Sequence, residues 1–179
     1  DFDELISLTE GEDKKRINRR IGLLAYCHIL EAEPPYELLA NLLRCAKGEK
    51  FHLKPFGHIQ AKLAQKDKKK WGKRSIFDPS SPPLPVKKKF DHIKALAKEA
   101  GFPELNEHID KFLDLDIRNA FSHANYIQTE EEFRYFVDEV PRAIKHEELV
   151  PKVLLSFRFI VALKMVVNTF LHEFSKKEK

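Results

Sequence analysis

ELVPKVLLSFRFIVALKMVVNTFLHEF, residues 148–174, is the stretch that decides the fold of this chain. Its apolar residues recur at steps of three and four, which is the period of one face of an α-helix. The residues that keep this spacing are Val153, Leu154, Phe157, Ile160, Val161, Lys164, Met165, Asn168 and Leu171. The pattern predicts a long and strongly apolar final helix.

Helical spacing also covers most of the chain ahead of this segment. Proline at a first helical turn and glycine just after a last turn mark several of the ends. The predicted helices run from Asp13 to about residue 31, from Pro34-Pro35 to Gly48, over about 56–69, from Phe90 to Gly101, and from Pro103 to about Tyr126.

The period changes just before the final helix. Residues 132–137 and 142–146 are runs that contain aromatic or β-branched side chains, and they flank 138–141. Such a pair of runs predicts a short β-hairpin. The fold class we expect is therefore all-α: an up-down helical bundle with a small β-hairpin before the last long helix. With 179 residues the chain fits a single domain over 1–179.

Composition excludes several classes of protein. Six glycines, none of them after Gly101, exclude the Gly-rich phosphate loops of nucleotide-binding α/β folds. Two cysteines, Cys27 and Cys45, cannot build a disulfide framework, so we expect small buried side chains in a reducing compartment. The uncharged stretches 21–30 and 165–172 are shorter than the roughly 20 residues that span a membrane. We also expect no signal peptide, no membrane partner and a cytoplasmic location.

The net charge of +4 is unevenly distributed. Residues 60–90 carry +8 and the rest of the chain carries −4. The basic residues of this segment are Lys62, Lys66, Lys68, Lys69, Lys70, Lys73, Arg74, Lys87, Lys88 and Lys89. Proline is dense between residues 75 and 85, so we expect a Lys/Pro-rich surface loop at about 66–89. Lysines with Trp71 among them could hold phosphates and stack on a base, or they could form a solvated face.

The sequence contains no familiar metal-binding or nucleophile motif. Eight histidines are present, but there is no Cys-x-x-Cys, no His-Glu-x-x-His and no Gly-x-Ser-x-Gly. We expect no metal and no cofactor.

One polar segment, residues 116–126, stands out from the apolar pattern. If the helix continues through it, Ser122 and Asn125 share a face with Arg118. His123 and Tyr126 stand in the same relation to Asn119, which forms a second polar stripe beside the first. A solvated helix face more often carries Lys and Glu. This surface therefore favours either a functional site or a structural use such as bracing the hairpin.

The sequence Arg118-Asn119-Ala120-Phe121-Ser122-His123 resembles the Arg-x(4–6)-His motif of the HEPN superfamily. Asn119 matches the polar residue that commonly follows the arginine. The context is similar as well: a helical bundle with the motif on a late helix, then a short β excursion and a long apolar helix. The specific resemblance covers roughly residues 105–174.

The resemblance implies a HEPN-like bundle that forms a homodimer through its motif helices. Many members are metal-independent endoribonucleases of toxin–antitoxin, phage-defence or RNA-processing systems. Carried over by position, Arg118, Asn119 and His123 are the catalytic residues, and the product is a 2′,3′-cyclic phosphate. Metal-free RNA cleavage needs a proton acceptor and a cation for the phosphate, which a histidine and an arginine supply. The RNA- or phosphate-binding candidates are Ser122, Asn125, Tyr126, Lys68, Lys69, Lys70, Trp71, Lys73 and Arg74.

Two other functions stay open. The chain could be a catalytically inactive HEPN module that binds RNA, a nucleotide, or a protein partner such as an antitoxin or a nucleotidyltransferase. It could also be a purely structural helical interaction protein that uses its Lys-rich face. Loss of RNA cleavage in His123→Ala would separate the ribonuclease from both.

Overall fold

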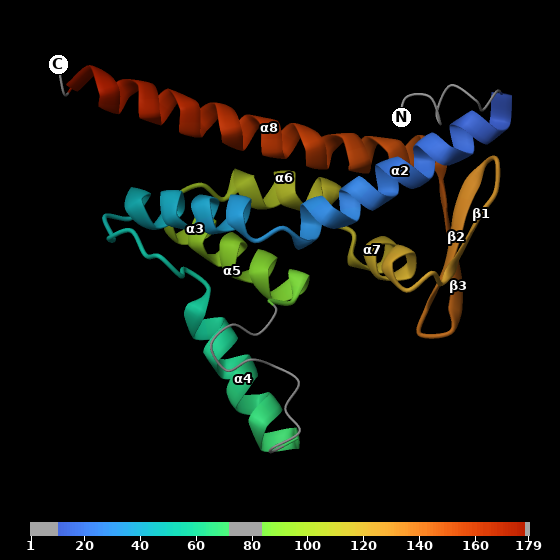
Figure 1. The fold of residues 1–179 in the computed structure, drawn as a ribbon, viewed down its shortest axis with the longest axis horizontal. Coiled ribbons are helices and arrows are strands. Elements are labelled where there is room, and N and C mark those ends of the chain that lie inside the picture. The colour runs from blue at the N-terminus through green and yellow to red at the C-terminus, as the bar shows by residue number, and fades with distance from the viewer. Residues whose placement is uncertain (1–10, 72–83, 178–179) are drawn as a thin grey trace, which may run out of the picture. The chain divides into compact units, whose positions relative to one another are not determined.

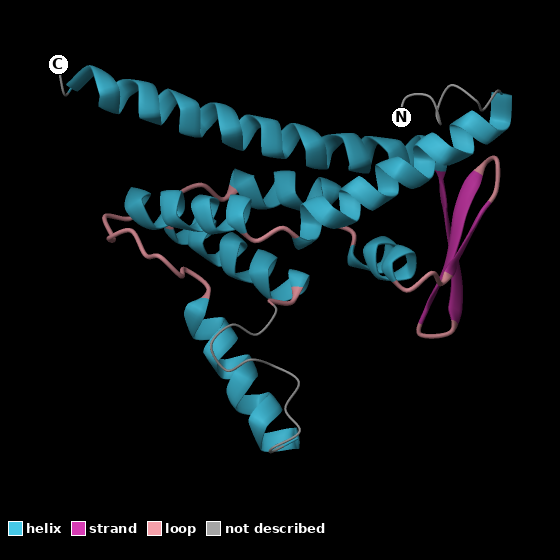
Figure 2. Ribbon diagram, in the orientation of Figure 1, coloured by secondary structure: helices cyan, strands magenta, loops and turns pink. Residues whose placement is uncertain are grey.

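The computed structural model describes residues 11–71 and 84–177. The described chain is mostly helical and holds one small antiparallel sheet (Figure 2). The elements are α2 (Gly11–Glu31), α3 (Pro34–Ala46), α4 (Gly57–Trp71), α5 (Val86–Glu99), α6 (Glu104–Phe112), α7 (Leu115–Ser122), β1 (Tyr126–Gln128), β2 (Glu132–Val137), β3 (Val140–Lys145) and α8 (His146–Lys177) (Figure 1). The mostly helical class and the long final helix are confirmed.

The described residues group into two compact units. One unit holds the described residues up to Leu30 together with those from Asp110 onward, and the other is Glu31–Ile109.

In the unit Glu31–Ile109, α3 packs against α5. Buried Tyr36 of α3 meets Phe90 of α5 edge to face, with 4.8 Å between the ring centroids. Both helices end as predicted: Gly48 and Gly101 follow the last turns with φ of +79° and +84°, a left-handed conformation that glycine adopts without steric cost. Local sequence therefore defines these two helices well.

The predicted Lys/Pro-rich loop at 66–89 is corrected at both ends. Helix α4 continues to Trp71 and α5 begins at Val86, and residues 72–83 lie outside the described part of the chain. Lys89 is fully buried. Its ammonium group donates hydrogen bonds to the carbonyl oxygens of Glu31 at 3.0 Å and Ala32 at 2.6 Å. Lys89 is thus a core residue and does not belong to a basic surface.

The other unit is built around α2, α7, the sheet and α8 (Figure 1). Tyr26 of α2 is buried and joins two segments, because its hydroxyl donates to the carbonyl oxygen of Phe112 at 2.6 Å and accepts from the amide of Asp114 at 2.9 Å. Helix α8 turns one face inward, with Leu149, Ser156 and Leu163 buried at a spacing of seven residues.

The prediction that both cysteines are buried is confirmed for one of them and wrong for the other. Cys27 is buried, but Cys45 is exposed in the last turn of α3.

The predicted hairpin is present as β2 and β3, and it belongs to a three-stranded sheet in the order β1-β2-β3. Asp138 and Glu139 connect β2 to β3 with φ of +48° and +67°. Two successive positive φ angles fit the right-handed twist of the strands, as in a type I′ turn. Strand β1 pairs antiparallel with β2, Tyr126 lying opposite Tyr135.

In the described part of the chain, the helices lack either the length or the apolar character needed to cross a membrane.

Candidate functional site

The start of α7, the helix that carries the motif, is held by Asp114. This residue is the N-cap, and its Oδ1 accepts a hydrogen bond from the amide of Ile117 at 3.1 Å. Its Oδ2 lies 3.4 Å from Nζ of Lys152 in α8. A capping side chain satisfies an otherwise unpaired amide at the helix start. The first turn of α7 is therefore anchored on both α2, through Tyr26, and α8.

The sequence predicts one helix from Pro103 to about Tyr126, whereas the structure has two helices here, α6 and α7, and α7 ends before Tyr126. The helix stops at Ser122, His123 is the C-cap, and Ala124 has a φ of +53°. The amide of Asn125 donates to the carbonyl of Ala120, and the amide of Ala124 donates to that of Phe121. This is the hydrogen-bond pattern of a Schellman motif, which closes a helix with a left-handed residue.

The two polar stripes expected on one continuous helix therefore do not form as predicted. Arg118, Asn119 and Ser122 lie on α7, whereas Asn125 follows the left-handed turn and Tyr126 is the first residue of β1. The chain turns here because β1 pairs with β2, a long-range contact that helical periodicity cannot indicate.

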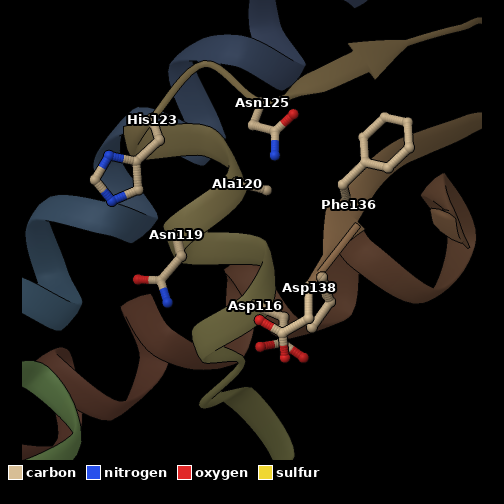
Figure 3. Close-up of a pocket in the computed structure, with 8 residues that line it drawn as sticks. Asp116, Asn119, Ala120, His123, Asn125, Phe136 and Asp138 are labelled. Carbon is tan, nitrogen blue, oxygen red and sulfur yellow. The ribbon is translucent and has the colours of Figure 1, made fainter. Parts of the chain in front are cut away.

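The motif residues still meet around the last turn of α7. Nη1 of Arg118 donates to Oδ1 of Asn119 at 2.9 Å. Asn119 and His123 are exposed, and Arg118 is half-buried. The amide of His123 donates to the carbonyl of Asn119, one turn earlier, at 3.0 Å. In Figure 3 the side chains of Asn119 and His123 project from the same side of the helix.

A surface cleft of about 270 Å³ runs along this turn. It lies between α7 and the end of the β2–β3 hairpin (Figure 3). Its lining residues are Asp116, Asn119, Ala120, His123, Asn125, Phe136, Val137 and Asp138. The cleft thus contains two of the three predicted catalytic residues and one predicted RNA-binding residue, Asn125. Arg118 does not line it.

Two carboxylates, Asp116 and Asp138, also line the cleft. Burial, followed by the negative charges of Asp114 and Asp116, raises the pKa of the nearby Tyr135 phenol. Both carboxylates are exposed, and their negative charges repel a phosphate to an extent that salt reduces. A phosphate is therefore disfavoured beside the carboxylates, while groups that donate hydrogen bonds are favoured there.

The remaining predicted RNA-binding residues fall in different places. Ser122 is exposed on α7, and Tyr126 is half-buried in a ring stack between Phe121 and Phe133, with centroid distances of 5.3 and 4.8 Å. Lys68, Lys69 and Lys70 are exposed in the last turn of α4, and Trp71 is the last residue of that helix. Lys73 and Arg74 lie outside the described residues.

Sequence reasoning missed Asp116, Phe136 and Asp138 as cleft residues. Asp116 could have been found, because it precedes Ala120 by four residues and helical spacing puts the two on one face. Phe136 and Asp138 reach the cleft only because β2 packs against α7. No local pattern indicates that contact.

Within residues 11–71 and 84–177, no three His, Cys, Asp or Glu side chains are grouped so that they could hold a metal ion.

Comparison with known proteins finds no match to this chain among protein-family models, curated proteins or solved structures.

Proposed function

We propose that this chain is a metal-independent endoribonuclease of the HEPN type that acts as a homodimer. The observation that carries the proposal is the setting of His123. His123 lies at the cleft rim at the end of α7, and its exposed imidazole projects from the same side of the helix as Asn119, whose side chain is hydrogen-bonded to Arg118 (Figure 3). An acid–base group beside a cation and an amide is the minimum that RNA cleavage without a metal requires.

The proposed reaction is an internal transfer of the phosphodiester. The 2′-hydroxyl oxygen attacks the neighbouring phosphorus, the bond from phosphorus to the 5′-oxygen breaks, and a 2′,3′-cyclic phosphate forms. His123 accepts the proton of the 2′-hydroxyl, and the corresponding histidine of the second protomer donates a proton to the leaving 5′-oxygen. Arg118 stabilises the negative charge that builds on the phosphate, with Asn119 orienting the guanidinium.

The two carboxylates constrain where the RNA lies. The phosphate is expected beside His123 and Asn119 and away from Asp116 and Asp138, whose negative charges repel it. Asp138→Asn removes one negative charge from the hairpin turn. It should tighten RNA binding about two- to tenfold at low salt, and the gain should fade as salt increases.

The expected partners follow from the HEPN resemblance. They are RNA, a second copy bound through the motif helices, and an antitoxin or nucleotidyltransferase partner of a toxin or defence system in the cytoplasm. The exposed lysines Lys68, Lys69 and Lys70 would attract RNA by charge rather than by reading bases.

The test is cleavage of end-labelled single-stranded RNA in EDTA, with identification of the fragment ends. Wild-type protein should leave a 2′,3′-cyclic phosphate, and a 2′-deoxy nucleotide at the cut position should block cleavage there. His123→Ala should lower the rate by at least about 100-fold. His108→Ala replaces another exposed histidine, on α6, and should leave the rate unchanged. Full activity in His123→Ala, or loss of activity in EDTA, would refute the proposal.

A second candidate, a non-catalytic binding module of the same fold, is favoured by the two carboxylates and by the absence of Arg118 from the cleft lining. It predicts RNA, nucleotide or protein binding without turnover, and binding that His123→Ala does not change. Titration of labelled RNA with wild-type and His123→Ala protein, combined with the cleavage assay, separates the two functions.

A further inference from the structure

Helix α8 carries a second apolar face that the fold leaves exposed. Val150, Leu154, Phe157 and Val161 follow one another at steps of four, three and four residues. Their side chains are 43%, 49%, 40% and 57% exposed. At about 100° per residue they form one stripe, roughly 120° around the helix from the buried face. We call these four residues the outer α8 stripe.

Exposure on this scale and with this spacing is uncommon on the surface of a monomer. Single exposed apolar residues are ordinary, but a contiguous row of them marks an interaction surface. Met165 and Val166 extend the exposed apolar surface by a further turn, at 64% and 52% exposed. Rows of apolar side chains with this spacing are the surfaces through which helices pack on one another.

We propose that a second copy of this chain covers the outer α8 stripe, with the two α8 helices antiparallel. The steps of four, three and four read the same in both directions, so the stripe is complementary to itself. An antiparallel pair places Val150 level with the partner's Val161, and Leu154 level with the partner's Phe157. Every large side chain of the stripe then faces another one, as a two-fold interface requires.

The charges at the two ends of the stripe favour the antiparallel direction. Exposed Glu147 lies one turn before Val150, and exposed Lys164 lies one turn after Val161. In the antiparallel pair Glu147 is level with the partner's Lys164 at both ends. In a parallel pair each of these residues would be level with its own copy, and like charges repel.

Arg158 lies beside the stripe and does not oppose this arrangement. It is exposed, and in the antiparallel register it is level with the partner's Val153. The two Arg158 residues are then about 7.5 Å apart along the helix axis. In a parallel pair they would lie at the same level.

Solution mass tests the pairing, measured by light scattering after size-exclusion chromatography. Leu154→Glu places a charge in the middle of the stripe and should halve the mass of the assembly. The mass falls from a dimer to a monomer if α8 provides the only interface, and from a tetramer to a dimer if the motif helices pair different copies. Leu53→Glu is the control, because Leu53 is 88% exposed in the segment between α3 and α4 and should leave the mass unchanged. A 20.9 kDa monomer for the wild type at 100 µM, or an unchanged mass for Leu154→Glu, overturns the proposal.

Charge exchange provides a test that does not depend on a buried substitution. Glu147→Lys and Lys164→Glu should each weaken association by about two- to tenfold, and the double variant should restore it. Single variants without effect would refute the antiparallel register, because a parallel pair only exchanges one like-charge contact for another.

Crosslinking reports the direction of the helices. In a Cys45→Ser background, which removes the exposed thiol, chains with Val150→Cys are mixed with chains that carry Val161→Cys. A short bismaleimide should join the two kinds of chain. It should not join Val150→Cys chains to one another, because these positions lie about 16 Å apart along the axis. Efficient crosslinking of Val150→Cys alone would refute the antiparallel arrangement.

This pairing does not depend on the proposed ribonuclease activity. His123→Ala should abolish cleavage without changing the mass, and Leu154→Glu should change the mass whether or not the protein cuts RNA.

Discussion

Replacing the buried Lys89 with alanine should destabilise the protein strongly. The side chain is fully buried, and its ammonium group donates to two backbone carbonyl oxygens, of Glu31 and Ala32, at the C-terminal end of α2. It also lies 4.5 Å from the centre of the Tyr36 ring. The carbonyls at a helix end have no partners within the helix, so Lys89 supplies what the helix itself cannot.

The expected loss follows from these contacts. Each of the two hydrogen bonds from the charged group to a part-buried carbonyl contributes about 1.5–3 kcal/mol, and the cation–π contact contributes about another 1 kcal/mol, which together give about 4–7 kcal/mol. Part of this loss of stability is offset, because the substitution also removes the desolvation penalty of a buried cation. We therefore expect Lys89→Ala to lower the free energy of unfolding by about 3–5 kcal/mol, a large share of the 5–15 kcal/mol typical of folded proteins.

Urea unfolding followed by circular dichroism measures the effect. Lys88→Ala is the matched control, because the neighbouring Lys88 is exposed and its removal should change the unfolding free energy by less than about 0.5 kcal/mol. Lys89→Met keeps most of the side-chain volume and removes the charge, so it should still lose about 2 kcal/mol. A Lys89→Met variant as stable as the wild type would refute the reasoning, since it would show that packing alone accounts for the residue.

Three further predictions concern hydrogen bonding, backbone conformation and pH. Tyr26→Phe should lower the free energy of unfolding by about 1–3 kcal/mol in the same urea assay, because the buried carbonyl of Phe112 loses its donor. Ala124→Gly should raise the melting temperature by a few degrees, since glycine relieves the cost of a left-handed residue at the end of α7; an unchanged or lower melting temperature would contradict this. Burial, followed by the charge of His58, lowers the pKa of His92 below its ordinary 6.5. The unfolded chain then binds a proton more readily than the folded one, so the unfolding free energy should fall as pH drops below about 7. His92→Gln should reduce this slope between pH 7.5 and 5.5.

The sequence alone predicts the helices whose ends are local in origin. Gly48 and Gly101 close α3 and α5 through their own left-handed conformations, and Pro34-Pro35 opens α3. These signals need no distant partner, because glycine and proline restrict only the backbone next to them. The hairpin of β2 and β3 is also predictable from local sequence, although its turn residues Asp138 and Glu139 are not the usual Asn-Gly pair.

The candidate site is predictable only in part. The motif residues Arg118, Asn119 and His123 are visible in the sequence, since they follow one another within a turn and a half of helix. Which of them line a cleft is decided by the packing of β2 against α7, which adds Phe136 and Asp138 and leaves Arg118 outside the lining. The packing of a strand depends on contacts with residues that are distant in the sequence, and the local periodicity of the sequence does not predict these contacts.

The final helix is likewise predictable from the sequence only in part. The apolar spacing of residues 148–174 determines that this segment is a helix, because the steps of three and four place apolar side chains in rows along it. The sequence does not distinguish the two rows, since both consist of large apolar residues. Only the tertiary structure decides that Leu149 and Leu163 are buried while Leu154 and Val161 remain exposed. The physical reason is that α8 has two apolar faces, and one side of the helix is all that the rest of this compact unit can cover.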